Sequence, residues 1–82
     1  MLLLGIDLGS SSVKVSVVDG ENGRTLSAAS YPPTEMEISA PVPGWAEQDP
    51  EEWRKNFTLA LAACLDPLGT KRNDIGAIGI SY

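Results

Sequence analysis

Five side chains with metal- and phosphate-binding chemistry fall within eight residues near the amino terminus. Asp7 lies near the end of an apolar run, Gly9 follows that run, and three serines at 10–12 precede Lys14. Proteins usually hold Mg²⁺ through one or two carboxylates together with water and substrate phosphates. Gly9 lets the backbone approach a ligand closely, and hydroxyls and backbone amides donate to phosphate oxygens. With the positive charge of Lys14, the stretch predicts a hairpin tip that holds Mg²⁺ and a polyphosphate.

The same spacing also fits an ordinary polar turn, and the residue types alone leave both interpretations open. In the second interpretation Asp7 accepts hydrogen bonds from nearby amides, and Lys14 is a solvated surface charge. An acidic residue at the end of a buried strand costs free energy unless a cation or hydrogen bonds match its charge. The stretch is neither a Walker A loop nor a dinucleotide fingerprint, because the chain lacks both glycine patterns.

The composition excludes several other classes of function. Six Lys and Arg stand against eleven Asp and Glu, and this net charge of −5 argues against nucleic acid or an anionic membrane as partner. One Cys and no His exclude a disulfide framework and any Ser-His or Cys-His catalytic pair within this chain. No apolar run approaches the ~20 residues that span a bilayer, and a signal peptide is not indicated. We expect a soluble, cytoplasmic α/β unit.

Three strands are predicted to position the Asp7–Lys14 stretch. The continuous apolar run 2–8 is typical of a central strand covered on both faces. Alternating valines predict a second strand over 13–18, and turn residues at 19–23 separate it from a weaker strand over 24–31. With connections this short, the three strands form an antiparallel meander.

A proline-rich loop, one helix and a fourth strand complete the predicted β-β-β-α-β order. Asp49 is a good N-cap, Pro50 suits the first helical position, and Glu52 lies where a capping box places an acidic residue. Apolar residues at three- and four-residue intervals predict a helix over 50–65. A fourth strand over 75–81 should run parallel to an earlier one, because a crossover helix precedes it.

Other aromatic and reactive side chains have plainer interpretations. Trp45 and Trp53 fit packing better than ligand stacking, and Glu47 fits an exposed loop carboxylate better than a ligand or a catalytic acid. Cys64 falls on the apolar stripe of the helix, so we expect it in the core. The chain stops at Tyr82, directly after a strand with a buried pattern, so we expect a fragment of a longer protein.

Three ordered motifs resemble a known family. They are GIDLGSSSVK at 5–14, WAEQDPEEW at 45–53 and AIGIS at 77–81. In this order they resemble the amino terminus of the FGGY carbohydrate kinases, over essentially the whole chain, although 20–42 match only in pattern. The resemblance implies that residues 1–82 begin the first of two domains, with the α/β, β-β-β-α-β start of an actin-like ATPase (ribonuclease H-like) fold.

The resemblance also implies an activity and a set of binding residues. The full-length protein would transfer the γ-phosphate of ATP to a hydroxyl of a small sugar in the presence of Mg²⁺, with D-xylulose as the expected substrate. Asp7 would help to hold Mg²⁺, directly or through water. Gly9, Ser10 and Ser11 would lie against the nucleotide phosphates, and Lys14 would neutralise them. No catalytic residue is expected within the chain, because the family's general base lies beyond Tyr82.

The sequence departs from the family pattern at two positions. Ser10 stands where the family usually has Thr, and the hydroxyl is kept; Tyr82 stands where a small residue is common, and this departure concerns the sugar preference. A glycerol or other polyol kinase is one alternative, suggested by Pro43, Gly44 and Trp45 of the loop. A non-catalytic, actin-like ATP-binding regulatory module that uses the same hairpin is another. The oligomeric state is not given by the sequence, and a homodimer of the full-length protein stays open.

Overall fold

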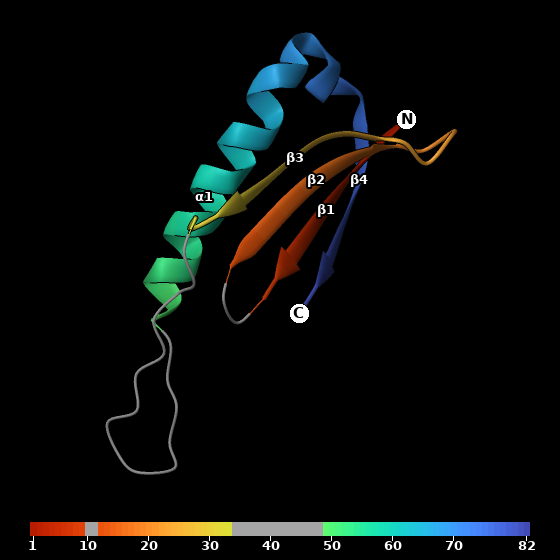
Figure 1. The fold of residues 1–82 in the computed structure, drawn as a ribbon. Coiled ribbons are helices and arrows are strands. Elements are labelled where there is room, and N and C mark those ends of the chain that lie inside the picture. Colours follow the sequence, from red (N-terminus) through yellow and green to blue (C-terminus); the bar gives the residue numbers. More distant parts are fainter. Residues whose placement is uncertain (10–11, 34–48) are drawn as a thin grey trace.

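The computed structural model describes residues 1–9, 12–33 and 49–82, and its four strands form one sheet with a helix on one face (Figure 1). Strands β1 (Leu2–Leu8), β2 (Val13–Asp19) and β3 (Thr25–Tyr31) come first along the chain. Helix α1 (Pro50–Leu65), the 3-10 segment η1 (Asp66–Asp74) and strand β4 (Ile75–Ser81) follow. This order confirms the predicted α/β class and the predicted β-β-β-α-β succession.

The strands lie in the order β3-β2-β1-β4. Neighbouring strands β1 and β2 are antiparallel, as are β2 and β3, so the predicted meander is confirmed. The fourth strand, β4, pairs with β1 and runs parallel to it, as expected for a strand reached through a crossover helix. Because β1 and β4 are parallel, their carboxyl ends lie side by side at one edge of the sheet (Figure 1).

Strand β1 is an inner strand, but only one of its faces is covered in the described residues. Leu2, Leu4 and Ile6 are buried on the face that looks toward α1, while Gly5 and Asp7 lie on the other face. The expectation of cover on both faces is therefore wrong for this part of the chain. We call the uncovered side the open face.

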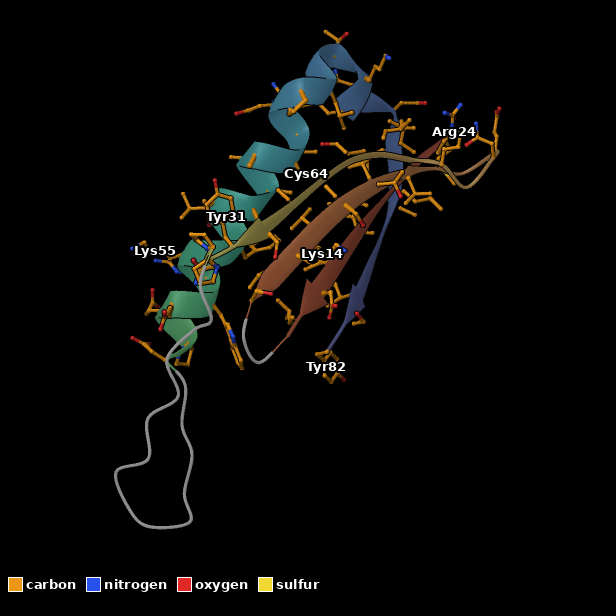
Figure 2. All side chains as sticks on the ribbon, in the orientation of Figure 1. Lys14, Arg24, Tyr31, Lys55, Cys64 and Tyr82 are labelled. Carbon is orange, nitrogen blue, oxygen red and sulfur yellow. The ribbon has the colours of Figure 1, made fainter. Side chains whose placement is uncertain are left out.

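The core lies between the sheet and α1. The valines of β2 that face the helix are completely buried, as is Cys64 of α1, so the prediction of a core cysteine is confirmed (Figure 2). Trp53 packs against this core and is partly buried, as predicted. The buried residues are Leu2, Leu4, Ile6, Val13, Val15, Val17, Ala60, Cys64 and Leu68.

Helix α1 begins and ends as its sequence signals predict, with two local differences. The side chain of Asp49 accepts a hydrogen bond from the Glu51 N–H at 3.0 Å, one residue earlier than in a capping box. Beyond Leu65 the chain continues in 3-10 turns to Asp74 instead of leaving the helix at once. Gly69 interrupts these turns with a φ of 57°, a left-handed conformation that favours glycine.

Replacing Asp49 by Ala should destabilise the chain by about 1 kcal/mol, because the first turn of α1 loses its side-chain acceptor. Urea unfolding followed by circular dichroism measures the change. Asp49→Asn is the matched control, since it keeps an acceptor oxygen and removes only the charge. Equal losses in both variants would mean that the charge, and not the cap, stabilises the helix.

Within the described segments, neither α1 nor η1 is long and apolar enough to cross a membrane. The proline-rich loop that connects β3 to α1 falls largely at 34–48, outside the described residues. Trp45 and Glu47 belong to that segment, so their predicted roles stay predictions.

Candidate functional site

Four polar side chains form a line across the open face, one from each strand. Lys14 of β2 lies opposite Asp7 of β1 on one side and opposite Ser30 of β3 on the other. Asp7 in turn lies opposite Ser81 of β4. All four residues are exposed, and we call them the polar row. Figure 2 labels Lys14, and it labels Tyr82 at the carboxyl end of β4.

The polar row lies at the edge of the sheet where the parallel strands β1 and β4 end. In α/β proteins ligands bind outside the carboxyl ends of parallel strands, because side chains and backbone groups of several strands converge there. Three residues of the row, Asp7, Lys14 and Ser81, suit an anionic ligand with a bound cation. The carboxylate can hold a metal, and the ammonium group and the hydroxyl can donate hydrogen bonds to a phosphate group. Ser30, at the far end of the row, does not line the hollow described below, and no ligand contact is assigned to it.

A shallow hollow of about 520 Å³ accompanies the row on the open face. Gly5 of β1 and Gly79 of β4 face each other and form part of the wall of this hollow. A Cβ added at Gly79 would meet no other atom within 4 Å. At Gly5 an added Cβ would come within 3.3 Å of Ser16 Oγ. Glycine inside a strand often marks close approach of a ligand or another backbone. The hollow is lined by Gly5, Ile6, Asp7, Lys14, Ser16, Gly79, Ile80 and Ser81.

The carboxylate of Asp7 is exposed, so the sequence argument from burial at the end of a buried strand does not apply to it. Its Oδ1 accepts a hydrogen bond from Ser81 Oγ at 3.3 Å. Asp7 and Lys14 face each other across β1 and β2. They do not form an ion pair with each other, and the ion pairs among residues 1–9, 12–33 and 49–82 involve other groups. Within the described residues neither charge neutralises the other, and both are exposed to a ligand.

The turn between β1 and β2 is closed by its backbone. The Gly9 N–H donates to the carbonyl oxygen of Ser12 at 3.0 Å. A Cβ at Gly9 would lie 3.1 Å from the same carbonyl oxygen, so the close approach of the two backbones favours glycine here. Ser10 and Ser11 lie outside the described residues. The predicted contacts of Gly9, Ser10 and Ser11 with phosphates remain predictions.

The donor set fits Mg²⁺ held jointly with a substrate and does not fit a protein-only metal cage. Among the residues that the structure describes, no group of three or more His, Cys, Asp or Glu side chains could hold a metal ion. Asp7 supplies one carboxylate, and Mg²⁺ in phosphoryl-transfer sites commonly takes one or two carboxylates, with water and phosphates completing its coordination. Asp7 could thus hold the metal, and Lys14 could contact the phosphates.

Sequence reasoning identified Asp7 and Lys14 and missed their neighbours on β4. Ser81 and Gly79 belong to a quoted motif, but no chemistry was assigned to them. The available signal was the predicted parallel pairing of 75–81 with an earlier strand. That pairing brings the end of β4 beside another strand end, although it does not by itself select the partner or the register.

The strand order β3-β2-β1-β4, with helix α1 on one face of the sheet, matches the start of an actin-like ATPase domain. The family described as "FGGY family of carbohydrate kinases, N-terminal domain" matches residues 2–82. The chain belongs to the FGGY family of carbohydrate kinases, as its motifs predicted.

Individual relatives include kinases for different substrates. The xylulose kinase of Escherichia coli is 36% identical over 80 residues, which is 98% of this chain and 15% of that protein. Glycerol kinase 2 of Thermotoga maritima is also 36% identical over 80 residues, covering 96% of this chain and 15% of the relative. A xylulose kinase structure from Brucella ovis superimposes with a TM-score of 0.82 at 36% identity, covering 98% of this chain and 16% of that one. This chain thus spans about 15% of the length of the curated relatives named here.

Proposed function

We propose that residues 1–82 are the N-terminal part of the first domain of a cytoplasmic kinase that uses ATP and Mg²⁺ to convert D-xylulose to xylulose 5-phosphate. The observation that carries this proposal is that Asp7, near the carboxyl end of β1 and beside the carboxyl end of the parallel strand β4, faces Lys14 of β2, with both side chains exposed, in a chain of the FGGY family. The choice of D-xylulose is supported by relatives and a solved structure that are named xylulose kinases.

Phosphoryl transfer requires positioning and neutralisation of charge on the phosphoryl oxygens, and the polar row offers groups for both tasks. Asp7 would hold Mg²⁺, directly or through water, and the ion would supply positive charge next to the phosphates. Lys14 adds a second positive charge next to Asp7. Gly9, Ser10 and Ser11 contact the phosphates from the turn. The general base that accepts the proton of the sugar hydroxyl lies beyond Tyr82.

Glycerol is the second candidate substrate, because a glycerol kinase matches this chain at the same 36% identity as a xylulose kinase. Residues that contact the sugar are expected beyond Tyr82, where the motifs of the two enzymes differ. Reading the gene past codon 82 separates them: Gln-Met-His-Gly resembles the xylulose kinases, and Gln-Arg-Glu resembles the glycerol kinases.

The decisive test is an assay of the full-length gene product with ATP and Mg²⁺. We expect D-xylulose to stimulate formation of ADP and a sugar phosphate far more than glycerol does. A preference for glycerol would replace the proposed substrate and retain the kinase. ATP binding without turnover of any sugar or polyol would instead favour the regulatory module.

The 82-residue chain alone should show no sugar-dependent ATP turnover. The chain contains side chains proposed to bind the metal and the phosphates, but the expected general base lies beyond Tyr82. An active site that lacks its general base and half of its cleft loses most of its catalytic rate. A coupled ADP assay with the purified chain measures this, with the full-length kinase as positive control. Sugar-dependent turnover by the chain alone would contradict the assignment of the base beyond Tyr82.

A further inference from the structure

The hydrogen bond between Ser81 and Asp7 joins residues 74 positions apart in the sequence. Ser81 Oγ donates to Asp7 Oδ1 at 3.3 Å, and the two residues face each other in the parallel pair of β1 and β4. Both side chains are exposed on the open face and line the same hollow. The contact therefore lies inside the site and is not needed to complete the hydrogen bonds of a buried core.

We propose that Ser81 is a positioning residue, whose hydroxyl holds the Asp7 carboxylate in the orientation that binds the metal. This inference rests on the proposed function, since it assigns Asp7 to Mg²⁺. In the described part of the chain, Ser81 is the residue whose side chain donates to this carboxylate. A bond to Oδ1 leaves Oδ2 available to a ligand.

An exposed aspartate needs such a partner because its side chain can otherwise rotate. Fixing a free side chain on binding costs conformational entropy, and a preformed hydrogen bond removes part of that cost before the ligand arrives. Without Ser81 the carboxylate could also turn toward Lys14, which faces it from β2. Hydrogen-bond partners behind a ligating carboxylate orient it in metal sites generally.

The opposite end of the polar row supplies a matched control. Ser30 lies opposite Lys14 on β3, as Ser81 lies opposite Asp7 on β4. Both serines are exposed strand residues, but Ser30 does not line the hollow. A Ser→Ala change at each position removes the same hydroxyl from the same row, and only one of the two removes a contact with the carboxylate.

The test compares full-length Ser81→Ala, Ser81→Thr, Ser81→Val and Ser30→Ala kinases. Electron paramagnetic resonance of free Mn²⁺ in the presence of ADP gives metal affinity directly, and the Mg²⁺ dependence of the initial rate gives a second readout. We expect Ser81→Ala and Ser81→Val to weaken Mn²⁺ binding by about tenfold. Ser81→Thr retains the hydroxyl and should restore binding to within about twofold of the parent, and Ser30→Ala should leave it unchanged.

The remaining outcomes separate this inference from the proposed function. Unchanged Mn²⁺ binding in Ser81→Ala and Ser81→Val, with binding lost in Asp7→Asn, would overturn the role of Ser81 and leave the metal site in place. Equal weakening in Ser81→Thr and Ser81→Val would also overturn it, because shape and not the hydroxyl would then be responsible. Unchanged binding in Asp7→Asn would overturn the metal site itself, and the inference with it.

Discussion

Replacing Asp7 by Asn in the full-length kinase should lower sugar phosphorylation by about a hundred- to a thousandfold, the range expected when one preorganised electrostatic group is removed from a transition state. The substitution keeps the shape of the side chain and an oxygen that can accept from Ser81. It removes the negative charge that attracts Mg²⁺. Asp7 is exposed and unpaired with Lys14, so the loss should not disturb the fold. Steady-state kinetics with varied ATP and Mg²⁺ measure the effect.

Asp74→Asn is the matched control for this prediction. Asp74 is also exposed, and its carboxylate lies 3.9 Å from the amino group of Met1 at the opposite end of β1 and β4. Exposed ion pairs of this kind contribute little to stability, so activity should stay close to that of the parent. If Asp7→Asn retained turnover within a few-fold of the parent, Asp7 would not be the metal ligand of this kinase.

The helix and the fourth strand could be predicted to the residue because their signals are local. Asp49 and Pro50 mark the start of α1, and the predicted bounds 50–65 and 75–81 are those of the structure. The alternation of valines in β2 likewise identified its buried face. Each of these signals comes from residues that are close together in the sequence, so it can be recognised in a single sequence.

The coverage of β1 could not be predicted from its composition. A continuous apolar run is compatible with cover on both faces, while the structure buries Leu2, Leu4 and Ile6 in the core on the α1 side of the sheet and places Asp7 on the open face. Whether the second face is covered depends on other segments and not on the run itself. For the same reason the sequence argument wrongly assumed that the Asp7 carboxylate is buried and therefore costs free energy.

The contact between Asp7 of β1 and Ser81 of β4 could not be predicted from the sequence either. The Asp7–Ser81 contact requires the register of a parallel pair, and that register shifts between Leu2 and Leu3. A slip of one residue would turn Ser81 to the other face. Residue types near Asp7 indicated metal and phosphate chemistry, but which residue of β4 meets the carboxylate is a tertiary property.

Replacing Val15 by Asp should unfold the 82-residue chain. Val15 is completely buried at the centre of β2, between the sheet and α1. An unpaired charge left in such a place costs about 3–5 kcal/mol. That cost is comparable to the whole stability of a small domain, about 5–15 kcal/mol. Far-UV circular dichroism and the urea midpoint report the loss.

Val18→Asp is the matched control, because Val18 lies on the same strand opposite Leu3, on the open face, and is only partly buried. The new carboxylate can reach water there, so we expect a cost of about 1 kcal/mol or less. A large difference in the free energy of unfolding between the two variants would mean that only one face of the sheet is buried in a core. Equal unfolding by both would mean that the open face is also buried in solution, and a buried open face could not present the polar row to a ligand in the isolated chain. Comparing the stabilities of the Val15→Asp and Val18→Asp variants therefore tests whether the open face is exposed to solvent, as the proposed site requires.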